Sequence, residues 1–200
     1  FSGSNAPAAA VKDGKIILLG DPSGRGPVIE TDNPELGDWK TNYAVINVPG
    51  GVQDPDLFVD DNGKVYLYEE SSNKWPIHGI ELDTENYYIP IGEQVDLFNL
   101  KPQKHGWERF GQDHDSDLKP FIEGPWMVKH NDTYYLEYGA PGTQWNVYAD
   151  GVYTSKDPLG PFEYAPYNPI SYKPGGFLKG SGHGSTVKDN HGNYWHYSTM

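Results

Sequence analysis

The chain has 200 residues, of which 36% are hydrophobic and 22% are charged, and it contains 24 glycines, 17 prolines and 15 tyrosines. This composition excludes a disordered chain and favours a single all-β domain, because glycine and proline mark tight turns and aromatic residues favour strands. The formal net charge of −13 argues against a nucleic-acid or anionic-membrane partner, since phosphate binding needs a basic surface, and a neutral glycan fits better.

The sequence contains no cysteine, which excludes disulfide bonds and cysteine-based metal or redox sites. No apolar run approaches the roughly 20 residues that a membrane-spanning helix needs. The first residues have neither the basic segment nor the apolar segment of a secretion signal. We therefore expect no membrane partner.

A strand, turn and strand pattern recurs four times along the chain. The copies are at residues 8–19, 57–68, 126–138 and 185–197. The Asp-Gly, Asn-Gly and His-Gly pairs in three of these copies supply the positive φ of a tight hairpin, and the flanking apolar runs have the length of strands. Each copy is therefore predicted to be a β-hairpin.

The spacing of the hairpins predicts a β-propeller. Each hairpin has an anchoring valine, and these are Val11, Val59, Val128 and Val187. They lie 48, 69 and 59 residues apart, which is the range of one four-stranded blade with variable loops. A second repeat, at residues 31–39 and 155–162, falls where the outer turn of a blade is expected. Residues 90–112 are irregular and polar, and we expect a long loop there.

The repeats amount to three blades, beginning near Ala6, Asp54 and Glu123, and the first hairpin of a fourth. Such an array would expose sheet edges and half of a core. We therefore expect residues 1–200 to form a partial propeller domain, with further blades before Phe1 and after Met200 in the intact protein.

Two carboxylates stand out as catalytic candidates. Asp54 and Glu123 each lie five residues before the anchoring valine of their hairpin, Val59 and Val128. The first strand of each propeller blade lines the central channel, so both carboxylates are expected to face one pocket. For Asp54 a turn or strand-start cap is the alternative interpretation. Glu123 lies among phenylalanine, isoleucine, proline and tryptophan, where a buried carboxylate without a partner would be costly.

Four motifs carry a resemblance to a known family. They are DPDLFVDDNG at residues 54–63, EGPW at 123–126, DPLGPF at 157–162 and GHGS at 182–185. Together they resemble glycoside hydrolase family 43, the five-bladed β-propeller enzymes that cut arabinosyl, xylosyl and related bonds. The resemblance covers nearly the whole chain and implies that it contains blades 2 to 4 and the start of blade 5.

The resemblance implies inverting hydrolysis of O-glycosidic bonds in pentose-containing plant polysaccharides or oligosaccharides. In this family an aspartate base activates water, a glutamate protonates the leaving oxygen, and a second aspartate modulates that glutamate. Glu123 matches the acid and Asp54 matches the modulator, whereas the base is expected upstream of Phe1. The expected partners are a neutral glycan and the remaining blades, and a non-catalytic sugar-binding propeller is the alternative function.

The remaining candidates concern metal and sugar binding. His183 resembles the central histidine that helps to hold calcium in family members, although a channel histidine bonded to a carboxylate is an equal alternative, and no cofactor is required. Trp126 and Trp145 are candidates for stacking on a sugar face, with core packing as the alternative. Asn5 is a candidate donor to a sugar hydroxyl. We expect a secreted or periplasmic bacterial enzyme whose signal peptide is not covered.

Overall fold

A computed structural model describes residues 5–21, 27–173 and 175–200. Within these ranges the chain is all-β, and its two helical segments are single 3-10 turns at Pro34–Leu36 and Gly106–Glu108, which confirms the all-β part of the predicted fold class. In the described part, no helix is long and apolar enough to span a membrane. The chain divides into two compact units, Phe1–Glu70 with His78–Asp96 and Ser71–Ile77 with Leu97–Met200.

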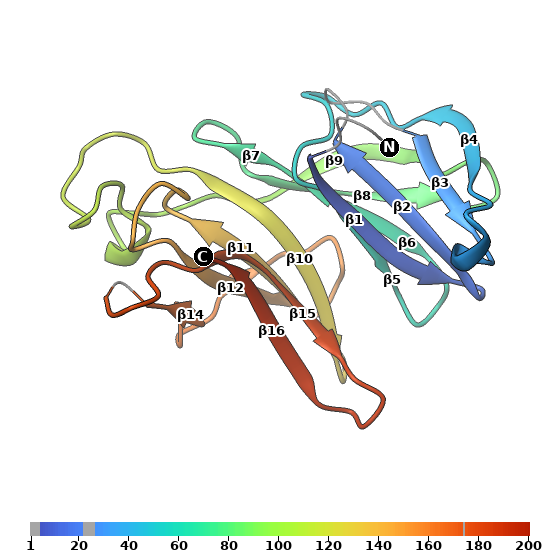
Figure 1. Ribbon diagram of the computed structural model, residues 1–200. Coiled ribbons are helices and arrows are strands. Elements are labelled where there is room, and N and C mark those ends of the chain that lie inside the picture. The colour runs from blue at the N-terminus through green and yellow to red at the C-terminus, as the bar shows by residue number, and fades with distance from the viewer. Residues whose placement is uncertain (1–4, 22–26, 174) are drawn as a thin grey trace. The chain divides into compact units, whose positions relative to one another are not determined.

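The first unit is built from two four-stranded sheets. The first sheet has the order β1-β2-β3-β4, with β1 (Asn5–Lys12), β2 (Lys15–Asp21), β3 (Pro27–Thr31) and β4 (Lys40–Val45), drawn in blue in Figure 1. The second has the order β5-β6-β8-β9, with β5 (Asp56–Val59), β6 (Val65–Glu69), β8 (Ile77–Asp83) and β9 (Ile89–Phe98). In both sheets the first two strands form one of the predicted hairpins.

The core of the first unit contains residues from both of its sheets. Ile17 and Leu19 on β2 are two positions apart and both fully buried, because alternate side chains of a strand share a face. They belong to one cluster with Leu57 on β5 and Leu67 on β6. Burying a leucine or isoleucine side chain stabilises the fold by about 1.5–3 kcal/mol, so this shared cluster holds the unit together.

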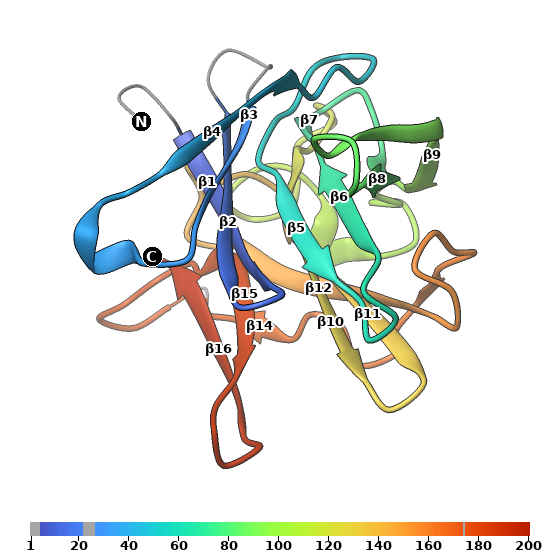
Figure 2. The same ribbon diagram turned by 90° about the vertical axis from the view of Figure 1, so that its right-hand side faces the viewer.

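The second unit contains a six-stranded sheet and a separate hairpin. The sheet path is β13-β12-β11-β10-β7, and β14 also pairs with β12. Its strands are β7 (Ser71–Ser72), β10 (Ile122–His130), β11 (Thr133–Ala140), β12 (Ala149–Ser155), β13 (Glu163–Tyr164) and β14 (Ser171–Tyr172). The separate hairpin consists of β15 (Gly182–Lys188) and β16 (Tyr194–Thr199), drawn in red in Figure 2. All four predicted hairpins are therefore confirmed.

Aromatic residues, which are abundant in this sequence, pack together in the core of the second unit. Phe98 ends β9 but belongs to the second unit, where its ring stacks on Tyr153 with centroids 3.9 Å apart and meets Tyr138 edge-on at 5.4 Å. The Tyr138 hydroxyl is satisfied inside this core because it donates a 2.6 Å hydrogen bond to the buried carboxylate of Glu108. Burial of this carboxylate raises its pKa.

The prediction of a long loop over residues 90–112 was wrong for its first part, because β9 extends from Ile89 to Phe98. This strand is the last in its sheet, and half of its residues are exposed while only Phe98 is buried, which explains its polar sequence. Pro90 near its start is typical of an edge strand, since proline donates no ladder hydrogen bond.

Candidate active site

The first strands of the repeats start with the same backbone distortion. In β1, β10 and β15 the pairing with the next strand shifts register near the N-terminal end, as in a β-bulge. At this point φ is positive at Ala6 (38°), Gly124 (58°) and His183 (52°), and it is also positive at Asp54 (44°), just before β5. A left-handed conformation costs a non-glycine residue about 1 kcal/mol or more, so its recurrence marks structurally equivalent positions.

This equivalence corrects the predicted alignment of the two carboxylates. Asp54 corresponds to the residue after Glu123, and it is Gln53 that corresponds to Glu123. The alignment by counting back from the valines was wrong because Val59 and Val128 do not occupy equivalent positions in their hairpins. Val59 belongs to the last pair of its hairpin, whereas two further pairs follow Val128.

Glu123 is held by two hydrogen bonds within the second unit. The Tyr148 hydroxyl donates to Glu123 Oε1 at 2.5 Å, and the Ser71 hydroxyl donates to Oε2 at 3.2 Å. Ser71 reaches Glu123 because β7 pairs with β10 at these two residues. Hydrogen bonds to a carboxylate are stronger than those between neutral groups, so the side chain is fixed while remaining half-buried.

Three glycines make room for the groups around Glu123. A Cβ atom at Gly139 would lie 2.6 Å from the Tyr148 hydroxyl oxygen, and one at Gly182 would lie 2.5 Å from the Tyr148 ring. At Gly124 a Cβ atom would lie 2.6 Å from the imidazole of His183. Tyr148 and His183 can therefore lie this close to the backbone only because the residues at these three positions are glycines.

No motif in the sequence indicates Tyr148 or Ser71 as a partner of Glu123. Tyr148 lies at the end of the irregular segment between β11 and β12, where its backbone N–H donates to the carbonyl of Trp145 at 3.1 Å. A tyrosine before a strand is unremarkable in an all-β chain with many tyrosines. The pairing of the two-residue strand β7 with β10 is non-local, and no pattern predicts it.

The predicted sugar-stacking tryptophans both contact protein groups. The Trp126 indole N–H donates to the carbonyl of Thr186 on β15 at 2.8 Å, and the side chain is half-buried. Trp145 packs edge-on against Phe110, with ring centroids 5.5 Å apart. A role in sugar binding stays a prediction for both residues. The side chain of Asn5 lies outside the described part of the structure.

Asp54 lies in the first unit, half-buried and two residues before β5. The segment before it is fixed by a 2.9 Å hydrogen bond from the backbone N–H of Glu70 to the carbonyl of Gln53. Asp54 and Glu123 belong to different compact units, and their meeting at one pocket stays a prediction.

A calcium ion, the predicted ligand of His183, prefers six to eight oxygen ligands. Among the described residues, the group of three or more carboxylate or imidazole ligands that comes together is Glu69, Glu70 and His78, and it does not include His183. A role of His183 in holding calcium therefore stays a prediction.

The repeated hairpins and their shared bulge are typical of the β-propeller class, and the hydrogen-bonded Glu123 at the start of β10 is the candidate carboxylate of its site. The sequence pattern of glycosyl hydrolases family 43 matches residues 19–199, and the chain belongs to this family.

Named relatives agree with this assignment. The chain is 28% identical over 153 residues to the β-D-galactofuranosidase xynD of Aspergillus niger, a match that covers 74% of this chain and 38% of the relative. It is 30% identical over 193 residues to xylosidase/arabinosidase 43A of Humicola insolens, covering 80% of this chain and 56% of the relative. The chain thus spans between about a third and just over half of these proteins.

A solved structure supports the same fold. The endo-1,4-β-xylanase of Bacteroides thetaiotaomicron superposes with a TM-score of 0.74 at 22% sequence identity, covering 98% of this chain and 65% of that chain. At this identity the likeness concerns the fold alone.

Proposed function

We propose that this chain forms part of an inverting glycoside hydrolase that cuts arabinosyl or xylosyl bonds in plant polysaccharides or oligosaccharides. Family membership supports the reaction class. The name of the Humicola insolens relative, a xylosidase/arabinosidase, supports the sugar class, whereas the Aspergillus niger relative is named for galactofuranose. The observation that carries the proposal is the geometry at Glu123, whose two oxygens accept hydrogen bonds from Tyr148 and Ser71.

In the proposed reaction Glu123 is the general acid. Its protonated carboxyl donates the proton to the oxygen of the leaving sugar as the glycosidic bond breaks, and it becomes a carboxylate. Tyr148 is a positioning residue, because its hydroxyl donates to the carboxylate that forms and holds it in one orientation. The hydroxyls of Tyr148 and Ser71 therefore hold the carboxyl group of Glu123 in place during the proton transfer.

Asp54 is proposed to modulate the acid and not to attack the sugar. An aspartate base, expected before Phe1, activates the water that attacks the anomeric carbon from the face opposite the leaving group. An inverting enzyme keeps its acid and base about 6.5–9.5 Å apart to leave room for this water.

The role of Glu123 is tested by comparing Glu123→Gln with the intact protein on two kinds of substrate. Natural oligosaccharides have poor leaving groups, so we expect kcat to fall by about 100-fold to 10,000-fold. Aryl glycosides with acidic leaving groups need little protonation, and their kcat should fall far less. Glu163→Gln, an exposed glutamate on β13, is the matched control and should leave both activities unchanged. An equal loss on both substrates would contradict the role as acid.

The inverting mechanism is tested by proton NMR of the first-formed sugar, read before mutarotation. We expect the anomeric configuration to be inverted and no covalent sugar ester on Asp54. Asp54→Asn should slow hydrolysis. Asp61→Asn, which changes an exposed residue of the hairpin, is the matched control. Retained configuration would refute the mechanism and make Asp54 a nucleophile. Sugar binding without any turnover would favour a non-catalytic carbohydrate-binding propeller.

A further inference from the structure

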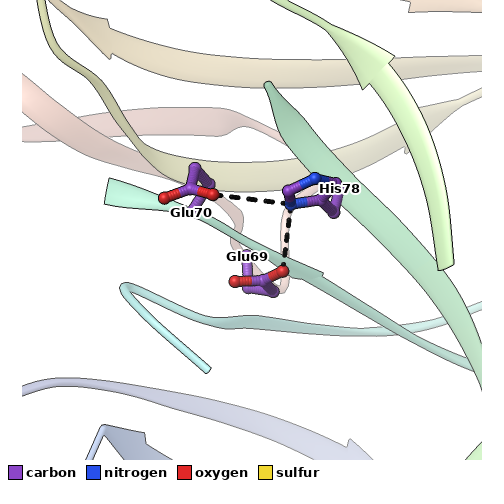
Figure 3. A group of neighbouring side chains, drawn as sticks. All are labelled: Glu69, Glu70 and His78. Atoms are coloured by element: carbon purple, nitrogen blue, oxygen red, sulfur yellow. Dashed lines mark ion pairs between the residues drawn. The ribbon is translucent and has the colours of Figure 1, made fainter. Parts of the chain in front are cut away.

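Two glutamates and a histidine meet inside the first unit. Glu69 ends β6, Glu70 follows it, and His78 lies on the neighbouring strand β8. Their exposed fractions are 2%, 5% and 9%. Figure 3 shows both carboxylates directed at one nitrogen of the histidine, with His78 Nδ1 3.2 Å from Glu69 Oε1 and 3.5 Å from Glu70 Oε2.

This cluster places negative charge where water cannot screen it. Two consecutive buried carboxylates repel one another, and removing each from water costs several kcal/mol unless a cation compensates. A divalent cation bound between them would carry a charge that matches the two carboxylates.

The nitrogen at the centre of the cluster forms ion pairs with both carboxylates, but neither contact has good hydrogen-bond geometry. His78 Nδ1 is buried and lacks a hydrogen-bond partner despite the two carboxylate oxygens near it. The three ligand atoms lie within 4.8 Å of one another. Donors about 2.0–2.2 Å from a tetrahedral metal ion are separated by roughly 3.3–3.6 Å, which agrees with the two distances from Nδ1.

The second ring nitrogen of His78, Nε2, also has a partner of the kind found at metal-binding histidines. His78 Nε2 lies 3.2 Å from Asp96 Oδ1 on β9, and Gln94 of the same strand donates to Glu69 Oε1. A histidine that ligates a metal through one nitrogen commonly donates its other N–H to a carboxylate, which fixes the ring. Asp96 can play this part while Nδ1 remains available.

We propose that Glu69, Glu70 and His78 form a binding site for a divalent transition-metal ion of the zinc class. An imidazole with two carboxylates is a ligand set that zinc accepts, and three protein ligands leave a fourth position for water. Calcium and magnesium prefer oxygen ligands alone and fit this set less well. The site goes beyond the proposed hydrolysis, and its failure would leave that proposal untouched.

The backbone at Glu70 adds a way to test the site without relying on a destabilised protein. Its φ of 152° lies in a region that favours glycine. Glu70→Gly should therefore relieve strain and remove a buried charge while deleting a metal ligand. We expect this variant to fold at least as well as the metal-free protein.

The test is calorimetric titration of the chelator-treated protein with zinc chloride, together with visible absorption after cobalt(II) is added. We expect one equivalent of zinc to bind and cobalt to show the intense bands of a tetrahedral site. Glu70→Gly and His78→Gln should weaken zinc binding at least about 100-fold, and Asp96→Asn about 10-fold to 100-fold. Glu93→Gln, an exposed glutamate on β9, is the matched control and should bind zinc like the unaltered protein.

The absence of saturable zinc binding in the unaltered protein would overturn the proposal. So would equal zinc affinity in Glu70→Gly and the unaltered protein, since binding would then lie elsewhere on the surface. Cobalt spectra typical of six oxygen ligands would likewise contradict the ligand set.

Discussion

Replacing His196 should make the stability of the second unit much less dependent on pH. His196 lies on β16, with Nε2 3.0 Å from Asp150 Oδ2 and Nδ1 3.4 Å from Glu137 Oε2. Both carboxylates are buried, with exposed fractions of 0% and 6%. Hydrogen bonds to Asp150 and then to Glu137 raise the pKa of His196 to about 10, although partial burial acts in the opposite direction.

The sign and size of the effect follow from this raised pKa. The protonated imidazole stabilises the fold fully below the ordinary histidine pKa of 6.5, and the contribution is lost as pH rises toward 10. The full shift corresponds to about 5 kcal/mol, but solvent screening at a half-buried ring reduces it, and we expect about 2 kcal/mol. His196→Gln should therefore destabilise the protein near pH 6 by about that amount and progressively less at higher pH.

Urea denaturation followed by tryptophan fluorescence at pH values from 6 to 10 measures this difference, and proton NMR of the His196 ring measures the pKa directly. His191→Gln, at the exposed tip of the same hairpin, is the matched control and should not change the pH dependence. A difference between His196→Gln and the unaltered protein that stays constant across this pH range would refute the reasoning. A normal ring pKa would refute it as well.

Three further substitutions have expected outcomes. Leu136→Ala removes a fully buried side chain of β11 and should lower the free energy of unfolding by about 2–5 kcal/mol in urea titrations. Tyr138→Phe leaves the buried Glu108 without its 2.6 Å donor and should cost about 1.5–3 kcal/mol, and an unchanged urea midpoint would argue against this bond. Gly124→Ala places a Cβ atom against His183 and should lower the melting temperature, since the backbone there is also left-handed.

The local features of the fold could be predicted from the sequence, whereas the non-local ones could not. Turn pairs such as Asp13-Gly14 mark a hairpin wherever they occur between short apolar runs, because the turn itself requires the glycine. Strand β9 was missed because an outer strand with exposed side chains carries no apolar alternation.

At the candidate site, Glu123 was found from its motif but its partners were not. Tyr148 and Ser71 reach it through a loop and a two-residue strand, and such contacts depend on tertiary structure alone. The one-residue error in aligning Asp54 with Glu123 arose from strands that run different lengths past the bulge, which a count along the sequence does not reveal.

The position of Tyr148 has a consequence for protein engineering. Segments between strands are the usual targets when specificity is altered by exchanging loops between relatives. The segment joining β11 to β12 is unsuitable for a free exchange, because its last residues include the tyrosine whose hydroxyl bonds Glu123. A graft one residue longer or shorter would displace that hydroxyl unless the new loop kept the turn in which the Tyr148 N–H bonds the Trp145 carbonyl. Chimeras should therefore be cut before Trp145, so that the donor to the carboxylate stays with β12.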